Sequence, residues 1–292
     1  MNSVVFGQQD KLSVITVEND FATAKITPYG ANVLSFVPKS SSNVADLLWV
    51  SPAARFDGRQ PVRGGIPICW PWFGKHSTDS TLPAHGFVRN ALWQLDQVSH
   101  LESGATELSF SIESSDESLK VWPYSFHLQL VVTVAESLTL RLVTTNLSDQ
   151  TMVLTEAFHS YFKVGDASKV TVSGLENSVH IDTLNTMKRS VQTKKLFLSP
   201  PMDSVFLNHA VDAKIDDVVL SRQISVRKQG SSSTVVWNPG SEIVKGFKDI
   251  SNEAWPEFLC VESGNVFEDV VTLLAGEKHE LKLELFSDAF VR

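Results

Sequence analysis

The sequence lacks the features that mark membrane, secreted and disulfide-stabilised proteins. No run of about 18 apolar residues occurs, and the opening MNSVVFGQQDKLSV has neither a basic segment nor an apolar core, so we expect no membrane span and no signal peptide. The 292 residues include only two cysteines, Cys69 and Cys260, each in an apolar run, which favours buried reduced thiols over disulfides. We therefore expect a cytoplasmic protein.

Strong positive charge and local metal-binding motifs are also missing. The formal net charge of -8 argues against nucleic acid or an anionic membrane as a partner. The eight histidines are scattered, and neither HExxH nor paired CxxC occurs, so we predict no metal and no cofactor, although distant residues could still assemble a metal site. A small molecule is the expected partner, an anionic one would need a local basic pocket, and a monomer is expected.

Helical periodicity is scarce, and the short segment 241–250 is the one helix that the pattern indicates. Apolar and polar residues instead alternate with a period of two, which is typical of half-buried strands. This alternation or a short apolar run marks strands near 22–27, 107–113, 126–134, 138–144, 170–173, 224–228, 234–237, 257–262, 270–274 and 279–286. Many short strands without long helices between them predict an all-β fold, a large antiparallel two-sheet β-sandwich. No repeat or linker divides residues 1–292, so we expect a single domain.

The segment 61–90, PVRGGIPICWPWFGKHSTDSTLPAHGFVRN, has neither helical nor strand periodicity. Glycines such as Gly64 and Gly65 allow a close approach of the backbone to a ligand, while prolines such as Pro67 keep the loop ordered without regular structure. A long ordered loop in a compact domain is typical of a functional site. The alternative is an ordinary connection whose aromatic residues cap the core.

Two arginines bracket this segment, Arg63 and Arg89. A guanidinium group is well shaped for bidentate contact with phosphate or carboxylate. If the loop is an ordinary connection, both side chains simply face water. If it forms a site, the two arginines give an acidic protein a local basic pocket.

Three further residues are candidates for chemistry. His159 lies in TEAFHSYF among bulky aromatic residues, where a histidine is more often part of a core than of a site. Glu262 shares strand parity with Phe258 and Cys260, and a carboxylate on such an apolar face is costly unless it is paired or functional. Asp203 follows two prolines in PPMDSVF, a context that by itself indicates an Asx turn.

These residues together carry a resemblance to a known family. RGGIPICWPWFG, LPAHGFVRN, the histidine of TEAFHSYF, the aspartate of DSVF and the glutamate of CVESGNV occur in the order and approximate spacing of the galactose mutarotase-like superfamily. The RGG and HGFVR segments more narrowly resemble hexose-6-phosphate mutarotases, also called glucose-6-phosphate 1-epimerases. The match runs from about Thr27 to Leu285, nearly the whole chain.

The resemblance implies a β-supersandwich with its site in a cleft on the concave sheet. It implies that His159 is the general acid and Glu262 the general base. Residues at matching positions would bind the sugar or its phosphate, and an aromatic would stack on the ring: Arg63, His85, Arg89 and Asp203 for binding, and Trp72 for stacking. Some family members have a glutamine before the His-Gly pair, where this chain has Ala84, so an amide contact from that position is not expected.

Exchange of the α and β anomers requires removal of the anomeric hydroxyl proton and protonation of the ring oxygen. With reference pKa values of about 4.3 and 6.5, Glu262 is expected to be ionised near neutrality and His159 to carry a proton. The arginines favour a hexose 6-phosphate, with glucose 6-phosphate as the expected substrate. Three alternatives remain: an aldose 1-epimerase acting on unphosphorylated sugar, a non-catalytic sugar-phosphate-binding protein, and a glycoside hydrolase that pairs Glu262 with Asp203.

Overall fold

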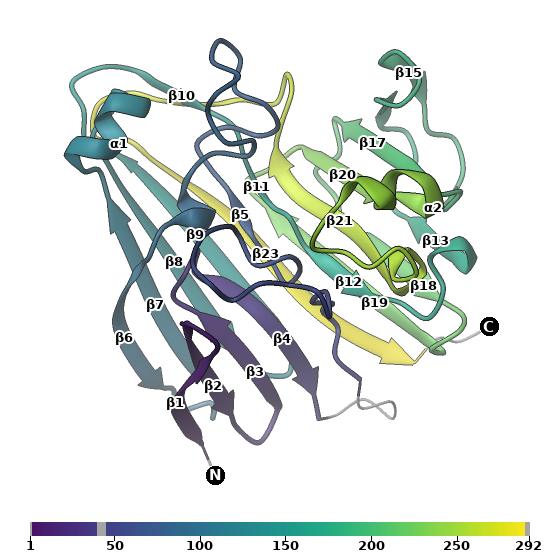
Figure 1. Ribbon diagram of the computed structural model, residues 1–292, viewed down its shortest axis with the longest axis horizontal. Helices are drawn as coiled ribbons and strands as arrows, with labels where there is room; N and C mark the ends of the chain where they lie inside the picture. Colours follow the sequence, from purple (N-terminus) through teal and green to yellow (C-terminus); the bar gives the residue numbers. More distant parts are fainter. Residues whose placement is uncertain (1, 40–44, 290–292) are drawn as a thin grey trace.

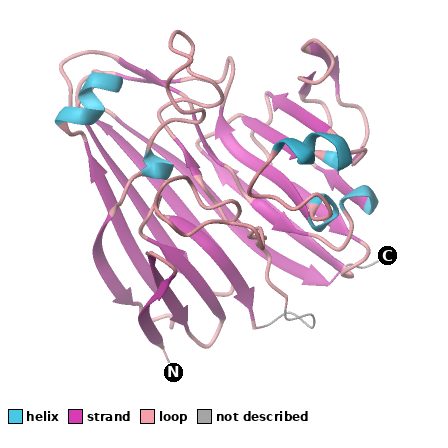
Figure 2. Ribbon diagram, in the orientation of Figure 1, coloured by secondary structure: helices cyan, strands magenta, loops and turns pink. Residues whose placement is uncertain are grey.

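The computed structural model describes residues 2–39 and 45–289, and antiparallel β-sheets dominate it, as the alternating pattern predicts (Figures 1 and 2). The largest sheet has nine strands and runs behind the rest of the molecule (Figure 1). Its strands, in spatial order, are β16 (Leu196–Phe197), β13 (Val170–Ser173), β18 (Ala213–Asp217), β19 (Arg222–Gln229), β23 (Lys278–Ala289), β9 (Leu138–Asn146), β8 (Phe126–Val134), β7 (Thr106–Glu113) and β6 (Gln94–His100).

Two further sheets lie over the nine-stranded sheet. The eight-stranded sheet has the order β15 (Lys188–Val191), β14 (Val179–Asp182), β17 (Met202–Leu207), β20 (Ser233–Asn238), β21 (Phe258–Asn265), β11 (Glu156–Phe158) and β5 (Ile68–Cys69), and β12 (Tyr161–Lys163) also pairs with β21. The four-stranded sheet has the order β1 (Ser3–Gln9), β2 (Leu12–Glu18), β3 (Ala22–Thr27) and β4 (Asn32–Pro38). A small ribbon joins β10 (Met152–Leu154) to β22 (Val271–Leu273).

The main core fills the space between these layers. Strand β8 shows why: every second residue of FHLQLVVTV is buried, from Phe126 through Leu130 to Val134. Leu259 and Val261 of β21 belong to the same apolar cluster, so this core joins the nine-stranded and eight-stranded sheets. Burial of each such side chain stabilises the fold by about 1.5–3 kcal/mol. In β8 the alternation seen in the sequence thus corresponds to one buried and one partly exposed face.

Helices are short and few beside the strands (Figure 2). Only the first part of the helix expected at 241–250 forms, as α2 (Gly240–Ile243) followed by the 3-10 turn η3 (Val244–Gly246), and residues 247–250 are not helical. Helix α1 (Asp116–Val121) is not predicted by apolar periodicity, and the side chains of Ser115 and Ser118 form a capping box at its start. The other 3-10 turns are η1 (Val88–Asn90), η2 (Ala167–Lys169) and η4 (Trp255–Glu257). Within the described residues, no helix has the length and apolar character needed to cross a membrane.

The segment 61–90 is mostly irregular, as its composition predicts, and contains only β5 and η1 as regular elements. Gly64 and Gly65 have positive φ angles of 115° and 71°, and a side chain at either position would collide with neighbouring backbone. Both cysteines are free and buried, as expected. The serine run at 40–42, expected as a loop tip, lies outside the described residues.

Candidate active site

A cavity of about 920 Å³ lies against the outer face of the eight-stranded sheet. Strand β21 shows how this sheet divides its two faces. Leu259 and Val261 pack into the main core, whereas Cys260 and Glu262 point to the opposite side, and Glu262 lines the cavity. The strand parity predicted for Glu262 is therefore confirmed, and the outer face of the sheet forms the floor of the cavity.

Strand register aligns several cavity residues in one row. Residues directly opposite each other in antiparallel strands share a face of the sheet. Asp203 is opposite Trp237, Trp237 is opposite Cys260, and Cys260 is opposite Tyr161. Glu262 lies two positions after Cys260 and so faces the same side. Sheet pairing thus brings together residues that are far apart in the chain.

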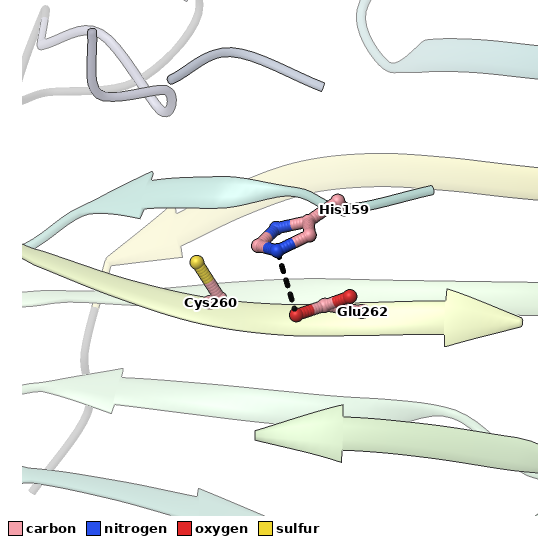
Figure 3. Close-up of side chains that lie close together, drawn as sticks. All are labelled: His159, Cys260 and Glu262. Carbon is pink, nitrogen blue, oxygen red and sulfur yellow. Dashed lines mark ion pairs between the residues drawn. The ribbon is translucent and has the colours of Figure 1, made fainter. Parts of the chain in front are cut away.

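His159 and Glu262 meet at this floor (Figure 3). The imidazole Nε2 of His159 lies 3.3 Å from Oε1 of Glu262. Both residues are buried, with exposed fractions of 8% and 1%, and both line the cavity. The two residues that the resemblance implies as acid and base are therefore in contact, on one wall of one cavity.

His159 does not lie in a strand, although the apolar character of TEAFHSYF is typical of one. It occupies the break between β11 and β12, where its N–H donates to the carbonyl of Pro67 at 2.9 Å. The N–H of Tyr161 similarly donates to the carbonyl of Gly65 at 2.9 Å. The Tyr161 ring stacks on the imidazole with centroids 4.8 Å apart and planes 9° apart. The loop carbonyls hold the break open, and the stacking fixes the orientation of the imidazole.

His85 enters the cavity from the loop and has an unusual backbone conformation, with φ of 63°. Its Nδ1 accepts a hydrogen bond from the N–H of Gly74 at 3.3 Å and lies 3.4 Å from Sγ of Cys69. Burial, with Arg89 next in importance, lowers the pKa of His85 to about 3. A neutral ring whose Nδ1 accepts carries its proton on Nε2, so His85 can donate a hydrogen bond to a substrate oxygen.

Trp72 and Arg89 do not line the cavity. The indole Nε1 of Trp72 donates to the carbonyl of Pro83 at 3.0 Å, and its ring packs in the main core. A guanidinium nitrogen of Arg89 donates to the carbonyl of Ala84 at 2.7 Å. Both side chains therefore hold the two residues just before His85. Their contacts differ from the expected stacking on the sugar and binding of phosphate, because they point into the loop instead of the cavity.

Arg63 does line the cavity, and contacts with neighbouring side chains fix its position. Its Nε donates to Oδ2 of Asp249 at 3.0 Å, and its Nη1 donates to the hydroxyl of Tyr161 at 2.9 Å. The guanidinium lies over the ring of Phe247, 5.1 Å from its centroid. Arginine has five N–H donors, so three remain for other partners.

Lys75 and Trp237 are among the cavity residues that the sequence did not single out. Lys75 follows the WPWFG motif and is the second cation of the cavity wall in the described part of the chain. Trp237 ends the run TVVW and presents an aromatic face to the cavity, the role expected of Trp72. Its strand parity with Val235 was the available signal. For Lys75, the sequence gave no signal beyond its place in the loop.

Asp203 lies within β17 and lines the cavity, so the Asx turn suggested by PPMDSVF does not form there. Its backbone carbonyl accepts hydrogen bonds from both the N–H and the hydroxyl of Thr183. Burial raises the pKa of the Asp203 carboxyl. A carboxylate in this position can accept hydrogen bonds from sugar hydroxyl groups.

Burial controls the protonation of the central pair. It raises the pKa of Glu262 well above its usual range, and the charge of Asp203 acts in the same direction. It lowers the pKa of His159 well below its usual range, with His85 and Arg89 adding to the shift. Reference pKa values predicted an ionised Glu262 beside a charged His159. Burial instead favours a neutral carboxyl beside a neutral imidazole, a pair that shares one proton.

Comparison with known proteins agrees with this geometry. The profile of the aldose 1-epimerase family matches residues 13–285. A protein of Escherichia coli (strain K12), provisionally named glucose-6-phosphate 1-epimerase, is 35% identical over 260 residues, covering 89% of this chain and 85% of that protein. A protein of Cenchrus ciliaris with the same provisional name is 33% identical, covering 90% of this chain and 80% of its own length.

Solved structures show the same likeness. The crystal structure of a provisionally assigned mutarotase from Salmonella typhimurium superposes with a TM-score of 0.90 and 30% identity, over 98% of this chain and 94% of that one. A galactose mutarotase-like protein from Clostridium acetobutylicum, 16% identical, has a TM-score of 0.79 over 99% of each chain and shares the fold. With the family profile matched over nearly its whole length, the chain belongs to the aldose 1-epimerase family.

Proposed function

We propose that this protein interconverts the α and β anomers of a hexose 6-phosphate, with glucose 6-phosphate as the expected substrate. The observation that carries the proposal is the contact between His159 and Glu262, 3.3 Å apart on the wall of a cavity that also contains Arg63 and Lys75. The provisional names of the relatives point to the same activity and the same substrate.

The reaction needs one base and one acid. The Glu262 carboxylate takes the proton of the anomeric hydroxyl while the His159 imidazolium gives a proton to the ring oxygen, which breaks the bond between the ring oxygen and the first carbon. The resulting open-chain aldehyde rotates about its first carbon–carbon bond. The ring then closes on the other face, with the two residues reversing their roles, so the protein ends the cycle in its starting state.

The shared proton connects this reaction to the pKa shifts. Burial favours a protonated Glu262 and a neutral His159, which cannot act in the required direction. Passing that proton across their 3.3 Å contact produces the carboxylate and the imidazolium without changing the total charge of the pair. A phosphate dianion bound in the cavity favours the imidazolium form. Substrate binding therefore helps to create the reactive pair.

The remaining cavity residues position the sugar. The Nε2–H of His85 donates to a sugar oxygen, and the Asp203 carboxylate accepts from sugar hydroxyl groups. The face of Trp237 packs against the apolar side of the ring. Arg63 and Lys75 give an acidic protein the local positive charge that a sugar phosphate requires.

One observation favours an unphosphorylated hexose as the alternative substrate. Asp249 lies 3.0 Å from Nε of Arg63 and neutralises much of its charge. Lys75 is then the only cation of the wall, among the described residues, with no ion-pair partner close to it. A neutral sugar would not need a second positive charge. The effect of the phosphate group on binding affinity distinguishes the two candidate substrates.

Exchange NMR of sugar anomers tests the proposal. We expect the wild-type protein to accelerate exchange of glucose 6-phosphate above its spontaneous rate, and far more than that of glucose or galactose at equal concentration. His159→Ala and Glu262→Gln should return exchange to near the spontaneous rate. Equal acceleration of all three sugars would favour the unphosphorylated substrate, and no acceleration of any would contradict the proposed activity.

A further inference from the structure

Cys260 lies beside the proposed catalytic pair but has no part in the proposed chemistry. It precedes Glu262 by two residues on β21, so both side chains leave the same face of the strand. Figure 3 shows its thiol on the same side of β21 as the imidazole of His159 and the carboxyl group of Glu262. Cys260 is fully buried in an apolar cluster. The register of the sheet thus puts a thiol, an imidazole and a carboxylate at one point.

The three side chains have the spacing of a metal site. One ligand atom from each of His159, Cys260 and Glu262 lies within 4.8 Å of the other two. The distance between Nε2 and Oε1 is 3.3 Å, and a tetrahedral zinc ion with bonds of about 2.0 Å to nitrogen and oxygen separates those atoms by roughly the same distance. Small rotations of the thiol and the carboxylate would complete such a geometry.

Buried polar atoms without hydrogen-bond partners at this point indicate that the site can bind a ligand. The second carboxylate oxygen of Glu262, Oε2, is buried and has no hydrogen-bond partner. The other ring nitrogen of His159, Nδ1, is also buried without a partner. Buried polar atoms normally have a partner, because leaving one unpaired costs about 1–3 kcal/mol. A cation bound to the carboxylate would remove part of this cost.

We propose that His159, Cys260 and Glu262 form a binding site for a thiophilic divalent cation, best matched by Zn²⁺, and that the bound ion blocks proton transfer by the pair. One imidazole, one thiolate and one carboxylate are all ligands that zinc accepts, and softer sulfur disfavours Mg²⁺ and Ca²⁺. The fourth position faces the cavity, where water would complete the tetrahedron. The blocking effect rests on the proposed function, whereas metal binding does not.

The charges of this site balance. Binding of Zn²⁺ displaces the thiol proton of Cys260 and the carboxyl proton of Glu262 into solvent, and the neutral imidazole of His159 offers its Nε2 lone pair. Thiolate and carboxylate then contribute two negative charges to match the ion. Because the ion occupies Nε2 of His159 and an oxygen of Glu262, neither group is free to exchange a proton with a sugar. The bound protein is therefore inactive as an epimerase.

Cobalt spectroscopy tests the site without any sugar. Co²⁺ replaces Zn²⁺ in tetrahedral sites, and a thiolate ligand gives a sulfur-to-cobalt charge-transfer band in the near ultraviolet. We expect this band in the wild-type protein and in Cys69→Ser, whose cysteine is equally buried but touches His85 instead. Cys260→Ser should lose the band. Absence of the band in the wild type, or its persistence in Cys260→Ser, would overturn the proposal.

Two further measurements separate a folding defect from a lost ligand. Cys260→Ala and His159→Ala, checked for a cooperative urea transition, should bind Zn²⁺ more weakly than the wild type by more than about 100-fold, beyond the roughly 10- to 100-fold effect of changing a group behind the ligands. Zn²⁺ at buffered free concentration should inhibit anomer exchange in wild type and Cys69→Ser but about 100-fold less potently in Cys260→Ala. Equal inhibition of all three would place the ion elsewhere. If exchange activity is absent, the cobalt band alone still decides the metal site.

Discussion

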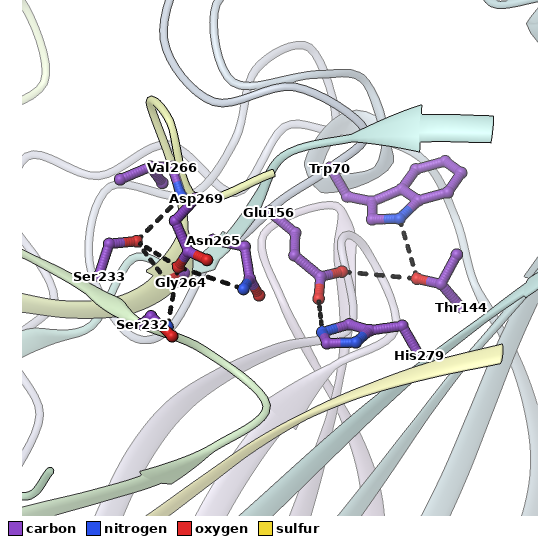
Figure 4. A network of polar contacts seen from close by, with 10 residues as sticks. All are labelled: Trp70, Thr144, Glu156, Ser232, Ser233, Gly264, Asn265, Val266, Asp269 and His279. Atoms are coloured by element: carbon purple, nitrogen blue, oxygen red, sulfur yellow. Dashed lines mark hydrogen bonds and ion pairs between the residues drawn. The ribbon is translucent and has the colours of Figure 1, made fainter. Parts of the chain in front are cut away.

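Two glutamate–histidine pairs, each with a buried glutamate, differ in their environments. In the cavity, His159 Nε2 lies 3.3 Å from Glu262 Oε1, and on the other side, His279 Nε2 lies 3.2 Å from Glu156 Oε1 (Figures 3 and 4). Glu156 begins β11, the strand that ends just before His159. The same two side-chain types at the same separation thus occur twice in one small region.

The second pair is anchored by neighbouring side chains, although Oε1 of Glu156 and Nε2 of His279 are themselves buried without a hydrogen bond. The hydroxyl of Thr144 donates to Oε2 of Glu156 at 3.5 Å and accepts from the indole Nε1 of Trp70 at 3.1 Å (Figure 4). Burial alone would lower the pKa of His279, but contact with Glu156 outweighs it and the pKa is raised. Contact with Glu156 therefore favours the protonated form of His279.

The cavity pair has the opposite setting. Burial lowers the pKa of His159, and both His159 and Glu262 line the cavity. The comparison shows that the two residue types alone do not determine the role of such a pair. A pair held by neighbouring side chains away from the cavity stabilises the fold, whereas a pair on the cavity wall is available for proton transfer.

The largest expected difference is in turnover. Glu262→Gln should lower kcat for anomer exchange about 10³-fold, because a positioned proton-transfer group contributes roughly 10²- to 10⁴-fold. The matched variant Glu156→Gln should leave kcat nearly unchanged, since Glu156 does not line the cavity. Exchange NMR at saturating glucose 6-phosphate measures both. Similar losses in the two variants would mean that the pairs do not differ in role.

Folding stability should depend more on the pair of Glu156 and His279 than on the cavity pair. His279→Ala leaves the fully buried Glu156 without its partner and should lower the free energy of unfolding by about 3 kcal/mol. His159→Ala should cost less, because Glu262 faces a cavity that water can enter. Urea unfolding followed by circular dichroism gives both values. A larger loss in His159→Ala would contradict the distinction between a structural and a reactive pair.

Substrate binding should distinguish the roles of Lys75, which lines the cavity, and Arg89, which does not. Lys75→Ala should raise KM for glucose 6-phosphate about 10-fold, since a hydrogen bond to a charged group contributes about 1.5–3 kcal/mol. KM for glucose should not change. Arg89→Ala should instead lower kcat/KM for both sugars, because Arg89 holds the carbonyl before His85 and does not line the cavity. Steady-state kinetics on both sugars would contradict this if Arg89→Ala affected only the phosphosugar.

The smallest expected effect is a pH dependence of stability. The folded-state pKa values of Glu156 and His279 are both raised, so the proton binds the folded state more tightly and the stability it contributes is lost as pH rises. The loss begins above the ordinary value of 4.5 for Glu156 and continues above 6.5 for His279. Urea unfolding between about pH 5 and pH 9 should show a flatter profile in the double variant Glu156→Gln with His279→Gln than in wild type. If stability changed with pH equally in the double variant and the wild type, this pair would not be the cause of the pH dependence.

The sequence was informative where a local pattern determines the structure. Alternation along β8 predicted a strand with one buried face, and strand parity within the apolar run of β21 predicted the direction of Glu262. The position of His159 could not be predicted from TEAFHSYF, because the break between β11 and β12 depends on carbonyl groups of Gly65 and Pro67 far away in the chain. Non-local hydrogen bonds of this kind leave no periodic signal.

The loop shows the same limit. Its composition predicted an irregular, ordered segment near the site, and the structure confirms that it lines the cavity through Arg63, Lys75 and His85. Composition could not tell which side chains point inward. Trp72 and Arg89 turn to carbonyls of the loop itself, and Trp237 supplies the aromatic face instead. Orientation inside an aperiodic loop is set by its folded shape.

The most direct test of the central claim is the exchange rate of glucose 6-phosphate anomers with the double variant His159→Ala, Glu262→Gln. If the two residues act as one acid–base unit, the double variant should be no slower than the slower single variant, with exchange close to the spontaneous rate. Catalysis that persists in the double variant well above that rate would show that other groups carry the reaction, and would contradict the account.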